Sequence, residues 1–375
     1  MQLSLDAKLV TSSPHMTRAR HSTRGIMLDV IVALVPAVLA AIFFFGHLVV
    51  VNLVVCCLSC VAFEYAYNLA YEKSRPSLDS WKKSSVHNLS CIVTATILAL
   101  NLPAFTDVWG FHWRSDTVIY LSLDTILICM IASLFAIVVC KMLFGGLGRN
   151  FVNPAMAARV FLLVSITGAM MSLGTSPIFG ADIGTNLSSG ASWLGMTGDG
   201  VYNQALSGGN VFFDMFIGNT PSAAVGETSV IAIALGYLYL VFKKRIDWRS
   251  PLILIGSAAV FALLLGFGDS RINYDSASAV FGYMLAQVLS GGLVFAAVFM
   301  VTDYVDSPNT FLGGIVYFVS IAFFTVSIRI FSSWQEGVSF ALLLGNILVP
   351  LIDRYIYPRP FGYVKKKKLA NNNVD

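Results

Sequence analysis

The 375-residue chain contains a series of long apolar runs that are separated by short polar segments. A membrane-spanning helix needs about 20 apolar residues, and most of the runs have roughly that length. Charged residues make up only 12% of the sequence, whereas a soluble domain carries about 25%. The sequence therefore predicts an all-α polytopic membrane protein with about ten transmembrane helices. The runs cover roughly residues 26–46, 48–70, 88–102, 117–141, 152–171, 227–242, 251–267, 279–302, 311–330 and 336–356.

The basic residues cluster at the ends of these runs, so the net charge of +4 does not indicate a nucleic-acid partner. If the N-terminus is cytoplasmic, only Arg114, Arg271 and Arg329 of the 24 Lys and Arg residues fall on the outer side. Cytoplasmic loops of membrane proteins carry an excess of Lys and Arg. We therefore expect both termini to be cytoplasmic and the long loop between the fifth and sixth runs to be extracytoplasmic.

Five predicted spans precede this loop and five follow it, so repeated halves would have opposite orientations in the membrane. The third span is short and ends at Asn101-Leu102-Pro103, and the eighth is interrupted at Gly291-Gly292. Such interruptions at matching positions indicate a site near the membrane midplane, and helix packing through small residues is the alternative. The predicted domains are a cytoplasmic N-terminal segment (1–25), a first five-helix half (26–171), an extracytoplasmic loop (172–225), a second five-helix half (226–356) and a basic cytoplasmic tail (357–375).

The predicted extracytoplasmic loop contains no Lys and no Arg, and it has ten glycines. Long loops without regular structure are usually functional. Its run Ser188-Ser189-Gly190-Ala191-Ser192-Trp193-Leu194 presents hydroxyl groups on a turn of small residues, which suits a covalent attachment. The sequence argues against a serine hydrolase, because the five His residues lie near the termini or in short loops and none is an evident partner for Ser192.

A glycine-rich motif, Gly145-Gly146-Leu147-Gly148-Arg149-Asn150-Phe151-Val152-Asn153-Pro154-Ala155-Met156, stands at the start of the fifth span. Asn153 can cap a helix that has Pro154 at its first position. The N-terminus of such a helix can hold an anion, and a re-entrant turn is the alternative interpretation.

Carboxylates inside a membrane are costly, and they mark ion pathways. Glu64 and Asp124 lie deepest in the predicted spans, while Asp303 and Asp353 end their spans on the cytoplasmic side. Two carboxylates at one mouth would concentrate cations, and the alternative is that Asp303 and Asp353 only cap helix ends. We therefore take Asp353, Asp303, Glu64 and Asp124 as candidates for an ion path.

No metal site is expected in this chain. Cys56, Cys57 and Cys60 are of a residue type that binds metals, but no second pair of cysteines and no His accompany them on the same predicted helix. A free thiol in an apolar helix behaves as a small hydrophobic side chain.

Several motifs spread over the sequence carry a resemblance to a known family. They are Ser13-Pro14-His15 with Ile26 to Ala37, the glycine-rich motif, Gly218-Asn219 with Gly226 to Ser229, Phe299 to Val305, and Glu336 to Asp353 with Pro358-Arg359. With these motifs the chain resembles the RnfD family, whose members belong to the Rnf electron transport complex, over essentially its whole length. The paralogue is NqrB of the sodium-translocating NADH:quinone reductase, which usually has a longer N-terminal extension.

The resemblance implies a component that is not a complete enzyme alone, within a complex of the bacterial cytoplasmic (inner) membrane. The complex exchanges electrons between ferredoxin and NAD and couples this transfer to the translocation of sodium ions or protons. The implied partners are the other Rnf proteins, RnfA, RnfB, RnfC, RnfE and RnfG. Two alternatives stay open: NqrB of the quinone reductase, and a flavin-independent channel or transporter, since inverted five-plus-five folds also form pores.

The resemblance also implies FMN, which members of this family carry through a phosphoester bond in a loop motif. The matching stretch here is Asn186 to Ser192, in which Ser189, Gly190 and Ala191 match and Ser192 stands in place of the acceptor Thr. A flavin transferase would be the attaching partner, and Asn186 replaces the Asp of its motif. A second stretch, Asp199 to Ala205, matches the opening of the motif but has no hydroxyl at the acceptor position. A noncovalent riboflavin deeper in the membrane is a further implied cofactor.

Overall fold

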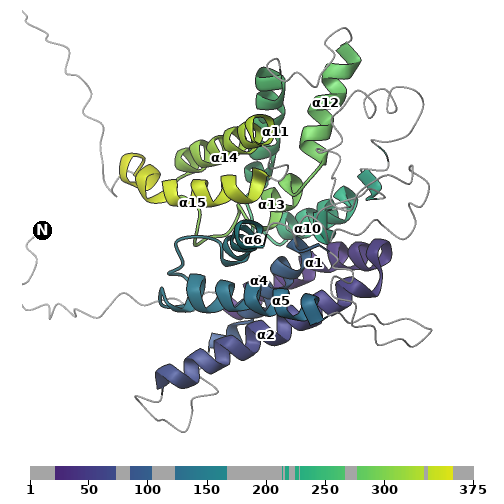
Figure 1. Ribbon diagram of the computed structural model, residues 1–375. Coiled ribbons are helices and arrows are strands. Elements are labelled where there is room, and N and C mark those ends of the chain that lie inside the picture. Colours follow the sequence, from purple (N-terminus) through teal and green to yellow (C-terminus); the bar gives the residue numbers. More distant parts are fainter. Residues whose placement is uncertain are drawn as a thin grey trace, which may run out of the picture.

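In the part of the chain that the computed structural model describes, the regular elements are all helices, and no strand occurs there (Figure 1). The described residues are 22–72, 85–103, 123–166, 213, 216–218, 224–227, 229–266, 277–332 and 337–357. The predicted loop at 172–225 and the two termini therefore lie almost wholly outside the described residues.

Within the described residues, each of the predicted apolar runs overlaps a helix or a pair of consecutive helices. The elements are α1 (Thr23–Phe45), α2 (His47–Glu72), η1 (Ser85–Asn88), α4 (Ser90–Asn101), α5 (Leu123–Leu134), the π-helix η2 (Phe135–Met142), α6 (Pro154–Ser165), η3 (Val225–Glu227), α10 (Val230–Phe242), α11 (Arg249–Gly266), α12 (Ala277–Leu289), α13 (Leu293–Phe299), α14 (Phe311–Phe331) and α15 (Gly337–Tyr355).

Six of the described segments are long and apolar enough to cross a membrane. They are Thr23–Phe45, Leu48–Ala70, Thr125–Met142, Arg249–Gly266, Phe311–Phe331 and Gly337–Tyr355. Helices α12 and α13 would form a seventh span, with a bend of 46° between them. The helices α4, α6 and α10 have only 12 or 13 residues, which gives them a length of roughly 18–20 Å. The structure thus fits a polytopic membrane protein, and the number of ten spans stays a prediction.

The two interruptions that the sequence indicates are present in the structure. Helix α4 ends at Asn101, and Leu102 follows it in an extended conformation. Helix α12 ends at Leu289, and the chain turns at Gly291, which has a positive φ of 69° that favours glycine. Helix α13 then begins at Leu293 as a separate helix of seven residues.

The helices form two groups around a central set (Figure 1). Helix α2 packs against α4, α5 and η2, while α11 packs against α14, and α14 against α15. Between the groups, α1 packs along α10, and α6 contacts both α4 and α15. A methyl group at Gly236 of α10 would overlap the Ala33 carbonyl oxygen of α1, so this glycine permits a close helix contact of the kind common in membranes.

Polar residues begin several of these helices. The side chain of Asn153 accepts hydrogen bonds from the amides of Ala155 and Met156, at 3.1 and 3.4 Å, and Pro154 is the first helical residue of α6. This confirms the cap that the sequence predicts. Because Asn153 itself satisfies these amides, the N-terminus of α6 is closed by the protein's own side chain.

Candidate functional site

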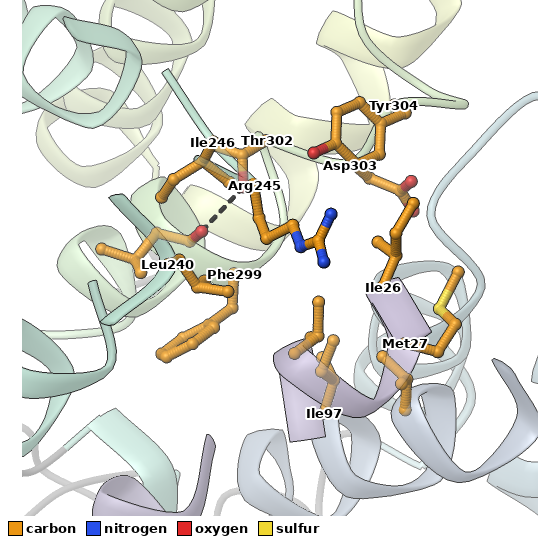
Figure 2. A pocket seen from close by; sticks show the side chains of 13 residues that line it. Ile26, Met27, Ile97, Leu240, Arg245, Ile246, Phe299, Thr302, Asp303 and Tyr304 are labelled. Carbon is orange, nitrogen blue, oxygen red and sulfur yellow. Dashed lines mark hydrogen bonds between the residues drawn. The ribbon is translucent and has the colours of Figure 1, made fainter. Parts of the chain in front are cut away.

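A cavity of about 80 Å³ opens between α1, α4, α10 and α13 (Figure 2). Its walls are mostly apolar, and its polar side chains are Arg245, Thr302, Asp303 and Tyr304. Asp303, one of the predicted ion-path residues, thus lines a cavity that both interrupted spans border. The remaining lining residues are Ile26, Met27, Val30, Val93, Ile97, Leu240, Ile246, Val298 and Phe299.

The guanidinium of Arg245 reaches into this cavity, with Leu240 and Phe299 to its left and Asp303 and Ile26 to its right in the view of Figure 2. Its Nε and Nη2 atoms both lie 2.7 Å from Asp29 Oδ2 on α1. The Tyr239 hydroxyl of α10 donates a 3.2 Å hydrogen bond to the other oxygen of Asp29. A fixed positive charge and a carboxylate therefore stand together at the wall of the cavity.

A second carboxylate, Asp306, lies close to Asp303 in the connection between α13 and α14. Asp306 is 3% exposed, and its oxygens accept hydrogen bonds of 3.0 and 3.2 Å from the side-chain amide of Asn150. Burial raises the pKa of Asp306 to about 8, and the negative charge of Asp303 adds to this increase. Burial also raises the pKa of Asp303. The Asp306 carboxyl can therefore hold a proton near neutral pH.

A buried polar cluster joins the two interrupted spans at the centre of the molecule. Arg159 Nη1 on α6 lies 2.6 Å from Glu227 Oε1 and 2.9 Å from Asn101 Oδ1 at the end of α4. A methyl group at Gly292, just before α13, would overlap the Glu227 carboxylate, with 2.8 Å to its Cδ. The glycine at the break thus provides the space that the carboxylate occupies.

A second buried ion pair lies in the first group of helices. Lys141 Nζ on η2 is 2.7 Å from Glu64 Oε2 on α2 and 2.8 Å from Ser90 Oγ at the start of α4. Lys141 is 2% exposed and Glu64 is fully buried. Glu64, another predicted ion-path residue, is therefore held by a lysine of the same chain.

The other predicted site residues have separate surroundings or lie outside the described part. Asp353 on α15 accepts hydrogen bonds of 3.1 and 2.8 Å from the backbone amide and the side-chain amide of Asn309. The side chain of Asp124 on α5 is not among those described. Ser189, Gly190, Ala191 and Ser192 lie wholly outside the described residues. The structure therefore brings Asp303 to the cavity and Glu64 to Lys141, and it pairs Asp353 with Asn309 in the connection between α13 and α14.

Within the described residues, no three His, Cys, Asp or Glu side chains converge as ligands of a metal ion would. The cysteines among them are free thiols.

Sequence reasoning missed the roles of three residues. Arg159 and Lys141 lie inside or at the end of predicted spans, and the sequence alone groups both with the cytoplasmic cations. A basic residue within an apolar run needs a buried partner, so its position alone could have directed attention to Glu227 and Glu64. Asp306 stands outside the predicted spans, and only the fold brings it to Asn150.

Comparison of the sequence with known proteins identifies the family of this chain. The model of the NQR2, RnfD, RnfE family matches residues 9–362. The chain is 35% identical to the D component of the sodium-translocating ferredoxin:NAD(+) oxidoreductase complex of Acetobacterium woodii, covering 96% of this chain and 97% of the relative. It is 31% identical to the D component of the proton-translocating ferredoxin:NAD(+) oxidoreductase complex of Clostridium ljungdahlii, covering 96% and 98%. It is also 31% identical to the D component of the ion-translocating oxidoreductase complex of Actinobacillus succinogenes, covering 94% and 98%.

These similarities extend over nearly the full length of the chain and of its relatives, and the matched range includes every buried polar cluster described above. The chain belongs to the NQR2, RnfD, RnfE family.

Proposed function

We propose that this chain is the RnfD component of an ion-translocating ferredoxin:NAD(+) oxidoreductase complex of the bacterial cytoplasmic (inner) membrane. The observation that carries the proposal is the similarity over nearly the whole chain to three relatives that are named as this component. The chain transfers electrons within the membrane and contributes to the ion path, and it acts together with RnfA, RnfB, RnfC, RnfE and RnfG.

Electron transfer in this proposal uses FMN bound covalently to the Ser192 hydroxyl through a phosphoester, after attachment by a flavin transferase. When bound, the flavin supplies the redox chemistry, and the protein supplies its position. Ser189, Gly190 and Ala191 are the residues of the matching family motif that directly precede the acceptor in the sequence. The lack of Lys and Arg in 172–225 supports an extracytoplasmic location for this loop.

The cavity beside Asp303 supports a role in ion passage rather than in flavin binding. Small-molecule cofactors occupy pockets of about 300–1,000 Å³, whereas this cavity holds about 80 Å³. That volume suits a few water molecules or a small cation. Asp303 would attract a cation to the cavity, and Glu64, Asp124 and Asp353 remain candidates for other positions on the path.

Two inverted five-helix halves with ten spans are part of the proposal. The packing of α2 against α5 and η2 resembles that of α11 against α14. Lys141, in the fourth span, bonds Ser90 in the third. Arg329, in the ninth, correspondingly donates hydrogen bonds to the Gln287 and Ser290 carbonyls at the end of α12 in the eighth. These matching contacts support a repeat.

The orientation with both termini cytoplasmic depends on exposed cations only. Lys141, Arg159 and Arg329 are buried, so they do not bear on the rule of positive cytoplasmic loops. Without them, the remaining Lys and Arg residues still lie overwhelmingly on one side. A reporter fused near Gly200 should read as extracytoplasmic, and a cytoplasmic signal there would contradict this orientation.

The decisive experiment is fluorescence of the denatured protein in an SDS gel after co-expression with the flavin transferase. We expect a fluorescent band for the unmodified chain, none for Ser192→Ala, and a retained band for the control variants Ser188→Ala and Ser189→Ala. Flavin found by mass spectrometry on another residue would reject Ser192. A non-fluorescent unmodified chain in an assembled complex would instead favour a flavin-independent channel or transporter.

The coupling ion and the electron acceptor are identified by two separate measurements on the reconstituted complex. Relatives of comparable similarity are named for sodium and for proton translocation. Uptake of ²²Na⁺ into vesicles during ferredoxin oxidation, compared with uptake of protons, distinguishes the two ions. Reduction of a quinone in place of NAD would identify the alternative, NqrB of the quinone reductase.

A further inference from the structure

Lys141 and Glu64 form an ion pair in a place where ions are costly to bury. Glu64 is fully buried, Lys141 is 2% exposed and Ser90 is 3% exposed. Each ion loses several kcal/mol of hydration on such burial, and a neutral pair of similar shape often replaces a buried ion pair without loss of stability. Stability alone is therefore a weak reason for both charges to be present.

The helix that carries Lys141 has an unusual backbone. Residues Phe135–Met142 form a π-helix of eight residues that continues α5. Its hydrogen bonding extends beyond Met142, where the Leu143 amide donates to the Val138 carbonyl and the Gly146 amide donates to the Lys141 carbonyl, both at 3.0 Å. Most π-helical segments are single turns, and they are frequent at functional sites. This segment is longer than one turn and ends at the residue after the one that pairs with Glu64.

The backbone of the segment offers a way to move the lysine. A change of register by one residue, from π-helical to α-helical bonding, rotates the following side chains by roughly 100° about the helix axis. Such a rotation carries the Lys141 ammonium away from Glu64 and Ser90. Gly145, Gly146 and Gly148 follow closely and have positive φ angles of 108°, 88° and 88°, so the chain can absorb this rotation without moving α6.

The electrostatics then require a replacement for the lysine. Separating this buried carboxylate from the ammonium that pairs with it is strongly unfavourable. The Cys91 thiol is a titratable group close enough to interact with both charges, and it carries no positive charge. A sodium ion or a proton is the smallest species that restores neutrality at Glu64.

We propose that the Lys141 ammonium binds the Glu64 carboxylate as long as no transported ion is bound there. When a transported sodium ion or proton arrives, a rotation of η2 moves the ammonium away from this carboxylate. The exchange replaces one positive charge with another, so Glu64 keeps a neutral environment throughout. Lys141 acts in this way as a positioning residue that prevents an ion leak and makes ion binding dependent on the state of η2. The inference depends on the proposed function, because it assumes that Glu64 belongs to an ion path.

The test uses the whole complex reconstituted into vesicles, with Lys141→Met and Lys141→Arg compared. Electron transfer is followed as a function of NaCl, or of pH if the unmodified complex is coupled to protons. Methionine removes the competing cation, so we expect the NaCl concentration for half-maximal electron transfer to fall by roughly tenfold, which corresponds to about 1.4 kcal/mol. If the complex is coupled to protons, we expect the pH of half-maximal electron transfer to rise by about one unit. Arginine stays charged and binds carboxylates through two hydrogen bonds, so we expect the half-saturating concentration to rise.

A purely structural lysine would not produce opposite shifts in these two variants. If both assemble and leave the ion dependence unchanged, or shift it in the same direction, the proposal is wrong. Should Lys141→Met fail to assemble, the neutral pair Lys141→Met/Glu64→Gln also removes the buried charge at position 64. We expect that double variant to assemble and transfer electrons with little ion transport, and normal ion transport by it would overturn the proposal. An unmodified complex that shows no coupling to either ion would instead refute the proposed function itself.

Discussion

The central ion pair of Arg159 and Glu227 allows a quantitative prediction about stability. The two residues are 2% and 5% exposed, and their closest atoms are 2.6 Å apart. The variant Arg159→Met fills similar space but removes the cation that pairs with the buried Glu227 carboxylate. Breaking a buried pair in this way costs about 3–5 kcal/mol. We expect the unfolding free energy of Arg159→Met to fall by about that amount.

The double variant Arg159→Met/Glu227→Gln should recover most of this loss, because it leaves a neutral amide at position 227. Replacing a buried ion pair by neutral groups of similar volume is often close to neutral. We expect the double variant to be about 2–4 kcal/mol more stable than the single variant Arg159→Met, a difference well above the ~0.5 kcal/mol scatter between independent sites.

The assay is unfolding of the purified protein by SDS titration, with helicity followed by circular dichroism. Arg354→Met is the matched control, because Arg354 on α15 is exposed and its loss should change stability by no more than about 0.5 kcal/mol. If Arg159→Met is as stable as this control, or if the double variant is less stable than the single one, the reasoning about a buried ion pair is refuted.

Three further predictions concern the break before α13 and the acidic residues. Gly292→Ala should destabilise the protein by about 1–3 kcal/mol in the same SDS titration, since its methyl group overlaps the Glu227 carboxylate. The control Gly256→Ala should not destabilise it, because a methyl group there meets no atom within 4 Å. The pKa of Asp306 is about 8 in the folded state, against 3.8 for an ordinary Asp. The contribution of Asp306 to the free energy of unfolding should therefore be largest below pH 4 and fall by up to about 1.4 kcal/mol per pH unit towards pH 8. Asp306→Asn should reduce this pH dependence when unfolding is measured at pH 5 and at pH 8. Asp353→Asn should leave flavin content and assembly intact and lower ion transport more than electron transfer in vesicles; unchanged coupling would mean that Asp353 only holds Asn309.

Much of the helical architecture could be predicted from the sequence, because membrane spans depend on local composition. The apolar runs, the short third span and the break at Gly291-Gly292 all correspond to features of the structure. The cap at Asn153 was also readable, since capping depends on neighbouring residues alone. Among the described residues, nevertheless, only six or seven segments are long enough to cross a membrane, so the count of ten rests on short and bent helices.

The partners of the charged residues could not be predicted in the same way. Glu227 and Arg159 are separated by 68 residues, and Lys141 and Glu64 by 77. A single sequence marks a buried charge as unusual, but it contains no local signal for which distant charge compensates it. The loop with Ser192 shows the opposite case, because its assignment depends on a family motif and it lies outside the described residues.

The close contact of α1 with α10 also has a consequence for the biogenesis of the protein. The Asp29 carboxylate of α1 meets Arg245 across 216 residues of sequence. At a synthesis rate of roughly 5–20 residues per second, this partner leaves the ribosome about 10–40 s after α1. Helix α1 must therefore stay in the membrane through most of translation before α10, which covers it in the folded protein, has been synthesised. A chain truncated after the first half keeps that surface uncovered, and membrane quality-control proteases should degrade it faster than the complete protein.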